Sequence, residues 1–215
     1  MTRLHTVDTR ANFWPALIDM LTSLLMFFLL VYFVEHDFNA GSAELAVARQ
    51  NQARFVEVLH REFAPEIAAR QVADSVDLKI LQIRFGEGVL FDRSEYRLKP
   101  EGRLILERLA AVFREVDASG QHLYDQIQVE GHTDDLRMDH ARYPRDNWEL
   151  STARATEVMR FLTRDVSPGL DERRMSVNGY AQNRPVSAER SRNRRIELRI
   201  FFSGSADAPA SGWLP

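Results

Sequence analysis

A stretch of 22 residues near the N-terminus, Phe13 to Val34, constrains the fold of this chain more than any other feature. Its residues are apolar or weakly polar except for Asp19, and a helix of about 20 such residues is long enough to cross a bilayer. An aspartate in the middle of a membrane helix costs about 2.5 to 3.5 kcal/mol. A chain that keeps one usually holds it in a protein interior or a wet pathway. The alternative is an aspartate that reaches water from the near end of the helix.

Charged residues on either side of this segment predict its orientation. Arg3 and Arg10 precede it, whereas Glu35, His36 and Asp37 follow it, so the positive-inside rule keeps the N-terminus in the cytoplasm. A cleaved signal peptide is the competing interpretation, but the apolar run exceeds the usual 7 to 15 residues and no clear cleavage site follows. We therefore expect a short cytoplasmic segment over residues 1–12 and an uncleaved transmembrane helix over 13–34.

Polar side chains inside this segment fall on one face of the helix. Asp19, Thr22 and Ser23 have the spacing i, i+3 and i+4, and the opposite face is wholly apolar. The polar stripe is expected to contact protein instead of lipid. Since a single span cannot enclose a pathway, the chain either forms oligomers or binds a larger multi-span partner.

Composition excludes several classes of function. The net charge of −3 and the pI near 6.1 lack the basic excess that is typical of nucleic-acid binders. The absence of cysteine excludes disulfides, cysteine-based metal sites and cysteine catalysis.

Residues 35–75 are expected to form a helical linker or stalk. Leu45, Ala48, Gln52, Phe55 and Leu59 follow roughly heptad spacing, which favours a short parallel pairing helix. The alternative is a helix that packs on the domain that follows it. A proline at position 65 predicts a break in this helix.

Residues 76–203 show alternating strand and helix patterns. This order is typical of a two-layer α/β domain with helices against one mixed sheet. Asp146 and Glu149 have the spacing of a capping box at the start of the second helix. The tail 204–215, rich in Gly, Ala, Ser and Pro, is expected to be disordered. The expected strands are Val76 to Phe85, Ile127 to Glu130, Met175 to Asn178 and Ile196 to Phe202, and the expected helices start at Pro100 and at Asn147, the latter ending near Thr163.

Five segments carry a resemblance to a known family: VLFDRSEYRLKPEG, VEGHTDD, NWELSTARATEVMRFL, VNGYAQNRP and NRRIELRI. In this order they resemble the OmpA-like peptidoglycan-binding domain, and GHTDD followed by NWELSxxRA resembles its MotB branch. The resemblance implies a periplasmic domain of a single-pass protein of the bacterial inner membrane, in the peptidoglycan-anchored half of an ion-driven stator. It implies a homodimer inside a ring of MotA-like multi-span subunits, with no enzymatic activity and no cofactor. H⁺ or Na⁺ would be transported by Asp19 with Thr22 and Ser23.

The same resemblance implies a site for the diaminopimelate of a peptidoglycan stem peptide. This group presents an ammonium and a carboxylate on one stereocentre, which a fixed anion and a planar guanidinium recognise. Asp134 and Arg154 match the family positions for these two roles. The other matching positions are Asn147 and Leu150, which line the pocket, and Arg194 or Arg195, one of which is expected to support it through Asp134 or its loop.

Departures from flagellar stator chains bear on the system that the protein serves. The cytoplasmic segment is very short, the link from membrane to domain is about 40 residues, and Asp19 lies in ALIDMLTSLLMFF where flagellar members usually show a tyrosine-alanine-aspartate context. The compact layout resembles the MotB-like ZorB subunits of Zorya anti-phage systems. A flagellar MotB and a purely structural tether between membrane and wall are the alternatives.

The sequence does not support two other chemistries, a metal site and nucleophilic catalysis. His132, Asp134, Asp135, Asp139 and His140 lie close in sequence, but they show no recognised metal-ligand spacing. Ser151 and His132 would be a nucleophile and a base, but no nucleophile elbow surrounds the serine. We therefore predict neither a metal site nor catalysis on the wall.

Overall fold

The computed structural model describes residues 13–117, 123–138 and 142–202. It divides into two compact units, Met1–Ala43 and Glu44–Pro215. Helix α1 (Phe13–Glu62) supplies residues to both units. The expected cytoplasmic segment 1–12 and the tail 204–215 lie outside the described residues.

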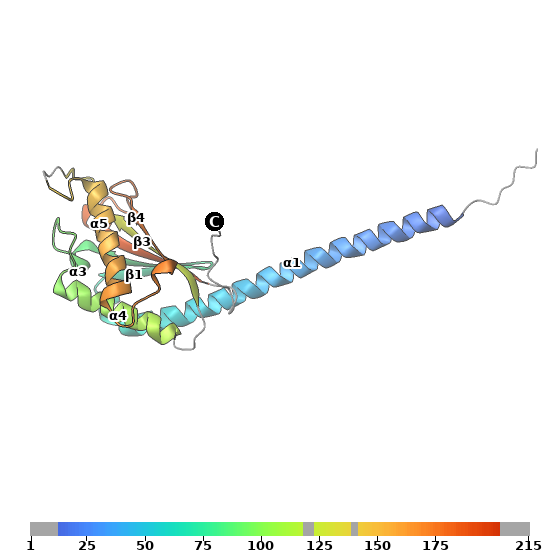
Figure 1. Ribbon diagram of the computed structural model, residues 1–215, viewed down its shortest axis with the longest axis horizontal. Coiled ribbons are helices and arrows are strands. Elements are labelled where there is room, and N and C mark those ends of the chain that lie inside the picture. The colour runs from blue at the N-terminus through green and yellow to red at the C-terminus, as the bar shows by residue number, and fades with distance from the viewer. Residues whose placement is uncertain (1–12, 118–122, 139–141, 203–215) are drawn as a thin grey trace, which may run out of the picture. The chain divides into compact units, whose positions relative to one another are not determined.

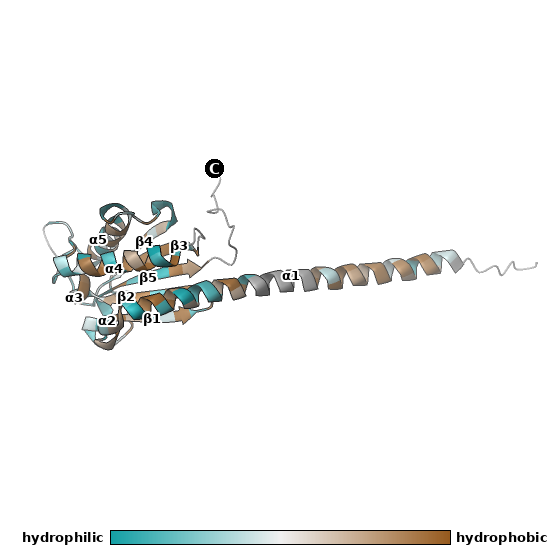
Figure 2. Cartoon of the chain, turned by 90° about the horizontal axis from the view of Figure 1, so that it is seen from below, coloured by the Kyte–Doolittle hydropathy of each residue, from teal (hydrophilic) through white to brown (hydrophobic). Residues whose placement is uncertain are grey.

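The N-terminal unit contains the expected apolar helix. Within the described residues, Trp14–Val34 is the one stretch of helix that is long and apolar enough to cross a membrane, with a mean hydropathy of 2.3 over 21 residues. Figure 2 shows this part of α1 in the hydrophobic colour. Large side chains such as Trp14, Met26 and Phe33 are more than half exposed. An apolar surface of this length requires lipid or protein around it.

The C-terminal unit is built on a five-stranded mixed sheet with the order β1-β2-β5-β3-β4 (Figure 1). All neighbouring strands are antiparallel except β3 and β4, which are parallel. Together with the apolar helix, this mixed α/β domain confirms the expected fold class. The strands are β1 (Val72–Asp77), β2 (Ile80–Gly86), β3 (Tyr124–His132), β4 (Met175–Gly179) and β5 (Arg195–Phe202).

Two long helices, α4 (Pro100–Asp117) and α5 (Asn147–Arg160), form the second layer with the end of α1. Their apolar faces share one core with alternate residues of the strands, because side chains along a strand point to opposite faces. Both helices were predicted. The short elements are α2 (Ala64–Ala68), α3 (Glu87–Leu90), a π-helical turn (Phe161–Asp165), a 3₁₀ turn (Glu172–Arg174) and α6 (Arg190–Asn193).

The C-terminal part of α1 packs on its own domain and does not extend as a stalk. Ala48, Phe55 and Leu59, which occupy the heptad positions, are fully buried in the core of the single chain. The Phe55 ring contacts the ring of Phe113 with 4.8 Å between centroids and that of Phe202 with 5.9 Å. These side chains are therefore not available to pair with a second copy, and the compact unit begins at Glu44 instead of Val76. The expected break occurs where α1 ends at Glu62 and α2 begins beside Pro65.

The expected strand from Val76 to Phe85 is wrong, because the chain turns back within it. Val76 pairs with Leu81 and Asp77 with Ile80, so Leu78 and Lys79 form the turn of a β1–β2 hairpin. Leu78 has a φ of 42°, a conformation usually supplied by Gly or Asn. Neither residue is present there, so the sequence gives no sign of the turn.

Gly131 allows α5 to lie directly against β3. A Cβ at this position would lie 2.0 Å from the carbonyl oxygen of Ser151 on α5. The Ser151 hydroxyl is buried, donates to the Trp148 carbonyl oxygen at 3.1 Å and accepts from the Ala181 backbone N–H at 3.1 Å. The serine therefore joins α5 to the loop after β4, and its surroundings are structural.

We expect Gly131→Ala to destabilise the domain, because the added methyl group forces α5 away from the sheet. Overpacking of this kind costs about 1 to 3 kcal/mol. Thermal unfolding of the detergent-solubilised chain, followed by tryptophan fluorescence, measures the effect. Gly88→Ala is the matched control, since a Cβ there would contact nothing within 4 Å. Equal melting temperatures for the two variants would contradict the close contact.

Candidate functional site

Asp134 lies just beyond the end of β3, where two neighbours fix its carboxylate. Only 6% of the residue is exposed. Its Oδ1 accepts a hydrogen bond from the Leu136 backbone N–H at 3.2 Å, and its Oδ2 accepts from Arg194 Nη1 at 2.7 Å. The loop itself is held to the domain because the Thr133 N–H donates to the Ala181 carbonyl oxygen at 2.9 Å. The carboxylate is therefore pre-positioned before any ligand arrives.

Arg154 on α5 is among the most deeply buried charged residues of the domain. Its exposed fraction is 2%. The Nε donates to the Glu95 carbonyl oxygen at 2.7 Å, and Nη2 forms an ion pair with Glu87 Oε1 at 2.5 Å. The guanidinium also lies over the Phe91 ring, 5.2 Å from its centroid. Burial lowers the pKa of Arg154, and the neighbouring Glu87 carboxylate opposes this effect.

Glu87, in the first turn of α3, connects the two arginines of the site. Its second oxygen, Oε2, accepts from Arg194 Nε at 2.5 Å. The hydrogen bond from Arg194 to Asp134 raises the pKa of Arg194. Sequence reasoning missed Glu87, because the apolar run VLF was recognised but not the short helix α3, which begins at Glu87 and includes the first two residues of that run. An ion chain thus runs from Arg154 through Glu87 and Arg194 to Asp134.

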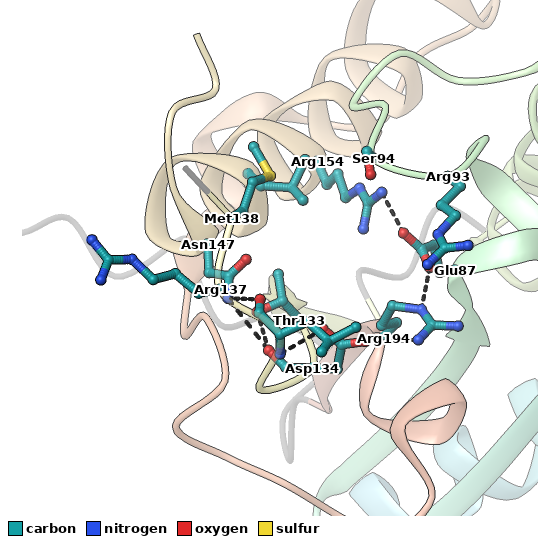
Figure 3. Close-up of a pocket in the computed structure, with 12 residues that line it drawn as sticks. Glu87, Arg93, Ser94, Thr133, Asp134, Arg137, Met138, Asn147, Arg154 and Arg194 are labelled. Atoms are coloured by element: carbon teal, nitrogen blue, oxygen red, sulfur yellow. Dashed lines mark hydrogen bonds and ion pairs between the residues drawn. The ribbon is translucent and has the colours of Figure 1, made fainter. Parts of the chain in front are cut away.

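These side chains surround a hollow of about 400 Å³. Figure 3 shows Arg154 and Asp134 on opposite sides of the opening, with Glu87 and Arg194 along one side between them. The four charges of the ion chain sum to zero. Arg93 and Arg137 add positive charge to the lining. The arrangement suits a small polar ligand that carries both charges.

Asn147 and Leu150, at the start of α5, line the same hollow. Helix α5 begins here because Asp146 Oδ1 accepts from the Glu149 N–H at 2.8 Å, the capping interaction that the sequence predicted. The Asn147 side-chain amide donates to the Leu136 carbonyl oxygen at 2.9 Å, which ties the Asp134 loop to the helix. The structure therefore brings together five of the six predicted pocket residues: Asp134, Asn147, Leu150, Arg154 and Arg194.

Arg195, the sixth, does not line this hollow and is buried in a separate charged cluster. Its Nε donates to Glu197 Oε1 at 2.6 Å, and its terminal nitrogens donate to the carbonyl oxygens of Asn193 and Arg184. Burial opposes ionisation of Glu197, but the hydrogen bonds from Arg195 and Arg84 outweigh it and lower the pKa of Glu197. Of the two candidate arginines, Arg194 is the one at the pocket.

His132 lies in this second cluster and not at the pocket. Three buried residues could each offer one ligand atom to a metal: Glu130, His132 and Glu197. These three atoms lie within 4.8 Å of one another. The Glu197 carboxylate already accepts hydrogen bonds from Gln82 and from the arginines at positions 84 and 195. Guanidinium groups therefore compensate these acids. Of the other residues weighed for a metal, Asp135 pairs with Arg190, and Asp139 and His140 lie outside the described residues.

The three predicted ion-carrying residues lie in the apolar part of α1. Asp19, Thr22 and Ser23 are exposed. The Thr22 hydroxyl donates to the backbone carbonyl oxygens of Ile18 and Asp19 at 2.9 and 3.0 Å, within its own helix. In the single chain, the carboxylate is thus presented on the helix surface.

A family model described as "OmpA family" matches residues 90–199, more than half of the chain. The chain belongs to the OmpA family. The matched residues include the whole ion chain except Glu87.

Individual relatives fall into two groups by coverage. YtxE and Motility protein B of Bacillus subtilis are both 35% identical, over 119 and 86 residues. The chain spans 45% of YtxE and 32% of Motility protein B, less than half of each relative. Zorya protein ZorB of Escherichia coli is 24% identical over 211 residues, which cover 93% of this chain and 84% of ZorB.

One solved structure with appreciable identity is the cell wall anchor of the T6SS from Pseudomonas aeruginosa. It is 32% identical, with a TM-score of 0.57, and the match covers 67% of this chain and 96% of that one. These similarities confirm the resemblance to MotB-like chains with an OmpA-like domain that the sequence motifs indicate.

The two arginines at the start of β5 should differ in their effect on stability. Arg195→Met leaves buried Glu197 without a main partner, and breaking a buried pair in this way costs about 3 kcal/mol or more. Arg194→Met should cost less, because Glu87 keeps Arg154 as a partner and Asp134 keeps the Leu136 N–H. Thermal unfolding of the detergent-solubilised chain at neutral pH compares them. The Arg195 contribution should fall as the pH falls through the lowered pKa of Glu197. Equal losses would contradict the assignment.

Proposed function

We propose that this OmpA-family chain is the peptidoglycan-anchored subunit of an ion-driven stator in the bacterial inner membrane. The domain binds the diaminopimelate of a stem peptide and holds the subunit still. The span carries H⁺ or Na⁺ and drives a surrounding ring. The N-terminus lies in the cytoplasm and the domain in the periplasm, in keeping with Arg3 and Arg10 before the span and acidic residues after it.

The observation that carries the wall-binding half is a fixed carboxylate opposite a buried guanidinium. The Asp134 carboxylate is suited to the ligand ammonium, and Arg154 to the carboxylate on the same stereocentre. Both residues are at least nine-tenths buried, where charged hydrogen bonds are stronger than in water. Asn147 and Leu150 form the wall of the pocket on the helix side.

The motor half rests on the acid in the span. Asp19 with the Thr22 and Ser23 hydroxyls would be enclosed by a second copy of the chain and by MotA-like multi-span subunits. One charge that crosses the membrane releases about 2.3 kcal/mol per 100 mV, which is the energy source for rotation. An aspartate that alternates between protonated and ionised forms serves H⁺, whereas the added hydroxyl oxygens would also suit Na⁺.

Zorya anti-phage defence is the system that we propose for this stator. The similarity to ZorB extends over 93% of the chain, including the span, whereas the match to Motility protein B covers 38%. The short link from the span to the domain points the same way. A purely structural tether is the second candidate, favoured by the 32% identity to a cell wall anchor.

Asp134→Ala should abolish binding to the cell wall. The ligand ammonium loses its counterion, and we expect the fraction of detergent-solubilised protein that sediments with purified sacculi to fall at least about tenfold. Asp135→Ala is the matched control, because this neighbouring aspartate is exposed and pairs with Arg190. Undiminished sedimentation of a folded Asp134 variant would refute the wall-binding role.

Asp19→Asn should abolish ion flow and biological activity but leave membrane assembly intact, because the amide is nearly isosteric and carries no exchangeable charge. Co-purification of multi-span subunits checks assembly, and proton uptake in vesicles checks flow. Asp77→Asn, an exposed change in the domain, is the control. An active Asn variant with no multi-span partner would support the tether, and plaque assays against motility assays separate defence from flagellar function.

A further inference from the structure

We propose that Glu87 is an internal counterion of Arg154, and that a ligand carboxylate binds to Arg154 by displacing it. Glu87 would thereby set both the affinity and the charge selectivity of the site. This inference rests on the proposed binding of diaminopimelate. It concerns a residue that lies outside the stretch matched by the family model.

Both oxygens of the Glu87 carboxylate are engaged by arginines. Oε1 lies 2.5 Å from Arg154 Nη2, and Oε2 lies 2.5 Å from Arg194 Nε. Only 10% of the side chain is exposed. The Glu87 carboxylate therefore binds the Arg154 guanidinium, which is the group that a ligand carboxylate would need. Figure 3 shows this pair at the edge of the opening.

Arg154 does not depend on Glu87 for its position. The Glu95 carbonyl oxygen accepts from Nε, the Phe91 ring lies beneath the guanidinium, and the residue is 2% exposed. Glu87 mainly supplies the negative charge that a buried guanidinium requires. Removal of this charge should leave Arg154 in place and in need of a new counterion.

Charge balance explains why the exchange is possible. A zwitterionic stereocentre adds one positive and one negative charge to a pocket whose ion chain sums to zero. Its carboxylate cannot lie beside Glu87 on Arg154 without repulsion between the two anions. If Glu87 moves off Arg154, it keeps Arg194 as a partner, because its other oxygen is already bound there.

The selectivity follows from the same exchange. A stem peptide that carries a carboxamide in place of the carboxylate beside the ammonium cannot replace Glu87 as a counterion. The wild-type pocket tolerates this ligand, because Arg154 remains neutralised by Glu87. Without Glu87, the pocket should favour the carboxylate form much more strongly.

The test measures binding of two synthetic tripeptides to the detergent-solubilised full chain by calorimetry. One is L-Ala–D-Glu–diaminopimelate, and the other carries a carboxamide in place of the carboxylate on the stereocentre that bears the free ammonium. Glu87→Gln keeps the shape and removes the charge. We expect it to bind the carboxylate tripeptide about tenfold more tightly than wild type and the carboxamide no more tightly. Glu95→Gln is the matched control, since it removes an exposed charge nearby and keeps the carbonyl that holds Arg154. Glu87→Ser is a second variant in case the first fails to fold.

The possible outcomes distinguish failure of the proposed exchange from failure of the proposed wall-binding function. Weaker or unchanged binding of the carboxylate tripeptide to a folded Glu87 variant would overturn the exchange, because a merely positioning residue gives that result. Equal gains for both tripeptides would overturn it as well. A wild-type chain that binds neither tripeptide would refute the wall-binding function together with this inference.

Discussion

The ion chain from Arg154 through Glu87 and Arg194 to Asp134 is the interaction on which the candidate site depends. It joins residues from α5, α3, the segment before β5 and the loop after β3, which are far apart in sequence. Because each acid is paired and nearly buried, none of these charges is left without compensation. A zwitterion therefore enters the site without a change in net charge.

Close backbone packing between α5 and β3 brings together Arg154 and Asp134, the two ends of the ion chain. Gly131 lets α5 touch β3, so Arg154 and Asp134 approach the same hollow. Sequence motifs predicted the members of this pair, since GHTDD and NWELSTARA match the family pattern. They could not predict that Glu87 would occupy the guanidinium, because this contact depends on how the four-residue helix α3 is placed in three dimensions.

The errors in the predicted fold also arise where the outcome depends on contacts in three dimensions. Strong local signals, such as Pro100 at the start of α4 and the cap at Asp146, correctly located both long helices. The turn at Leu78 had no Gly or Asn to reveal it, and the heptad positions of α1 looked the same whether they faced a second chain or their own domain. A pattern of apolar residues predicts which face is buried but not what buries it.

The two adjacent arginines show how strand alternation divides structural from binding residues. Arg195 begins β5 and shares a face of the sheet with Glu197, whereas Ile196 and Leu198 face the helices. Arg194 precedes the strand, so alternation does not apply to it, and its side chain reaches the pocket. The buried layer of Glu130, His132, Arg195 and Glu197 thus fixes the start of β5. By holding that backbone, the layer positions Arg194 between Glu87 and Asp134 without touching the ligand site itself.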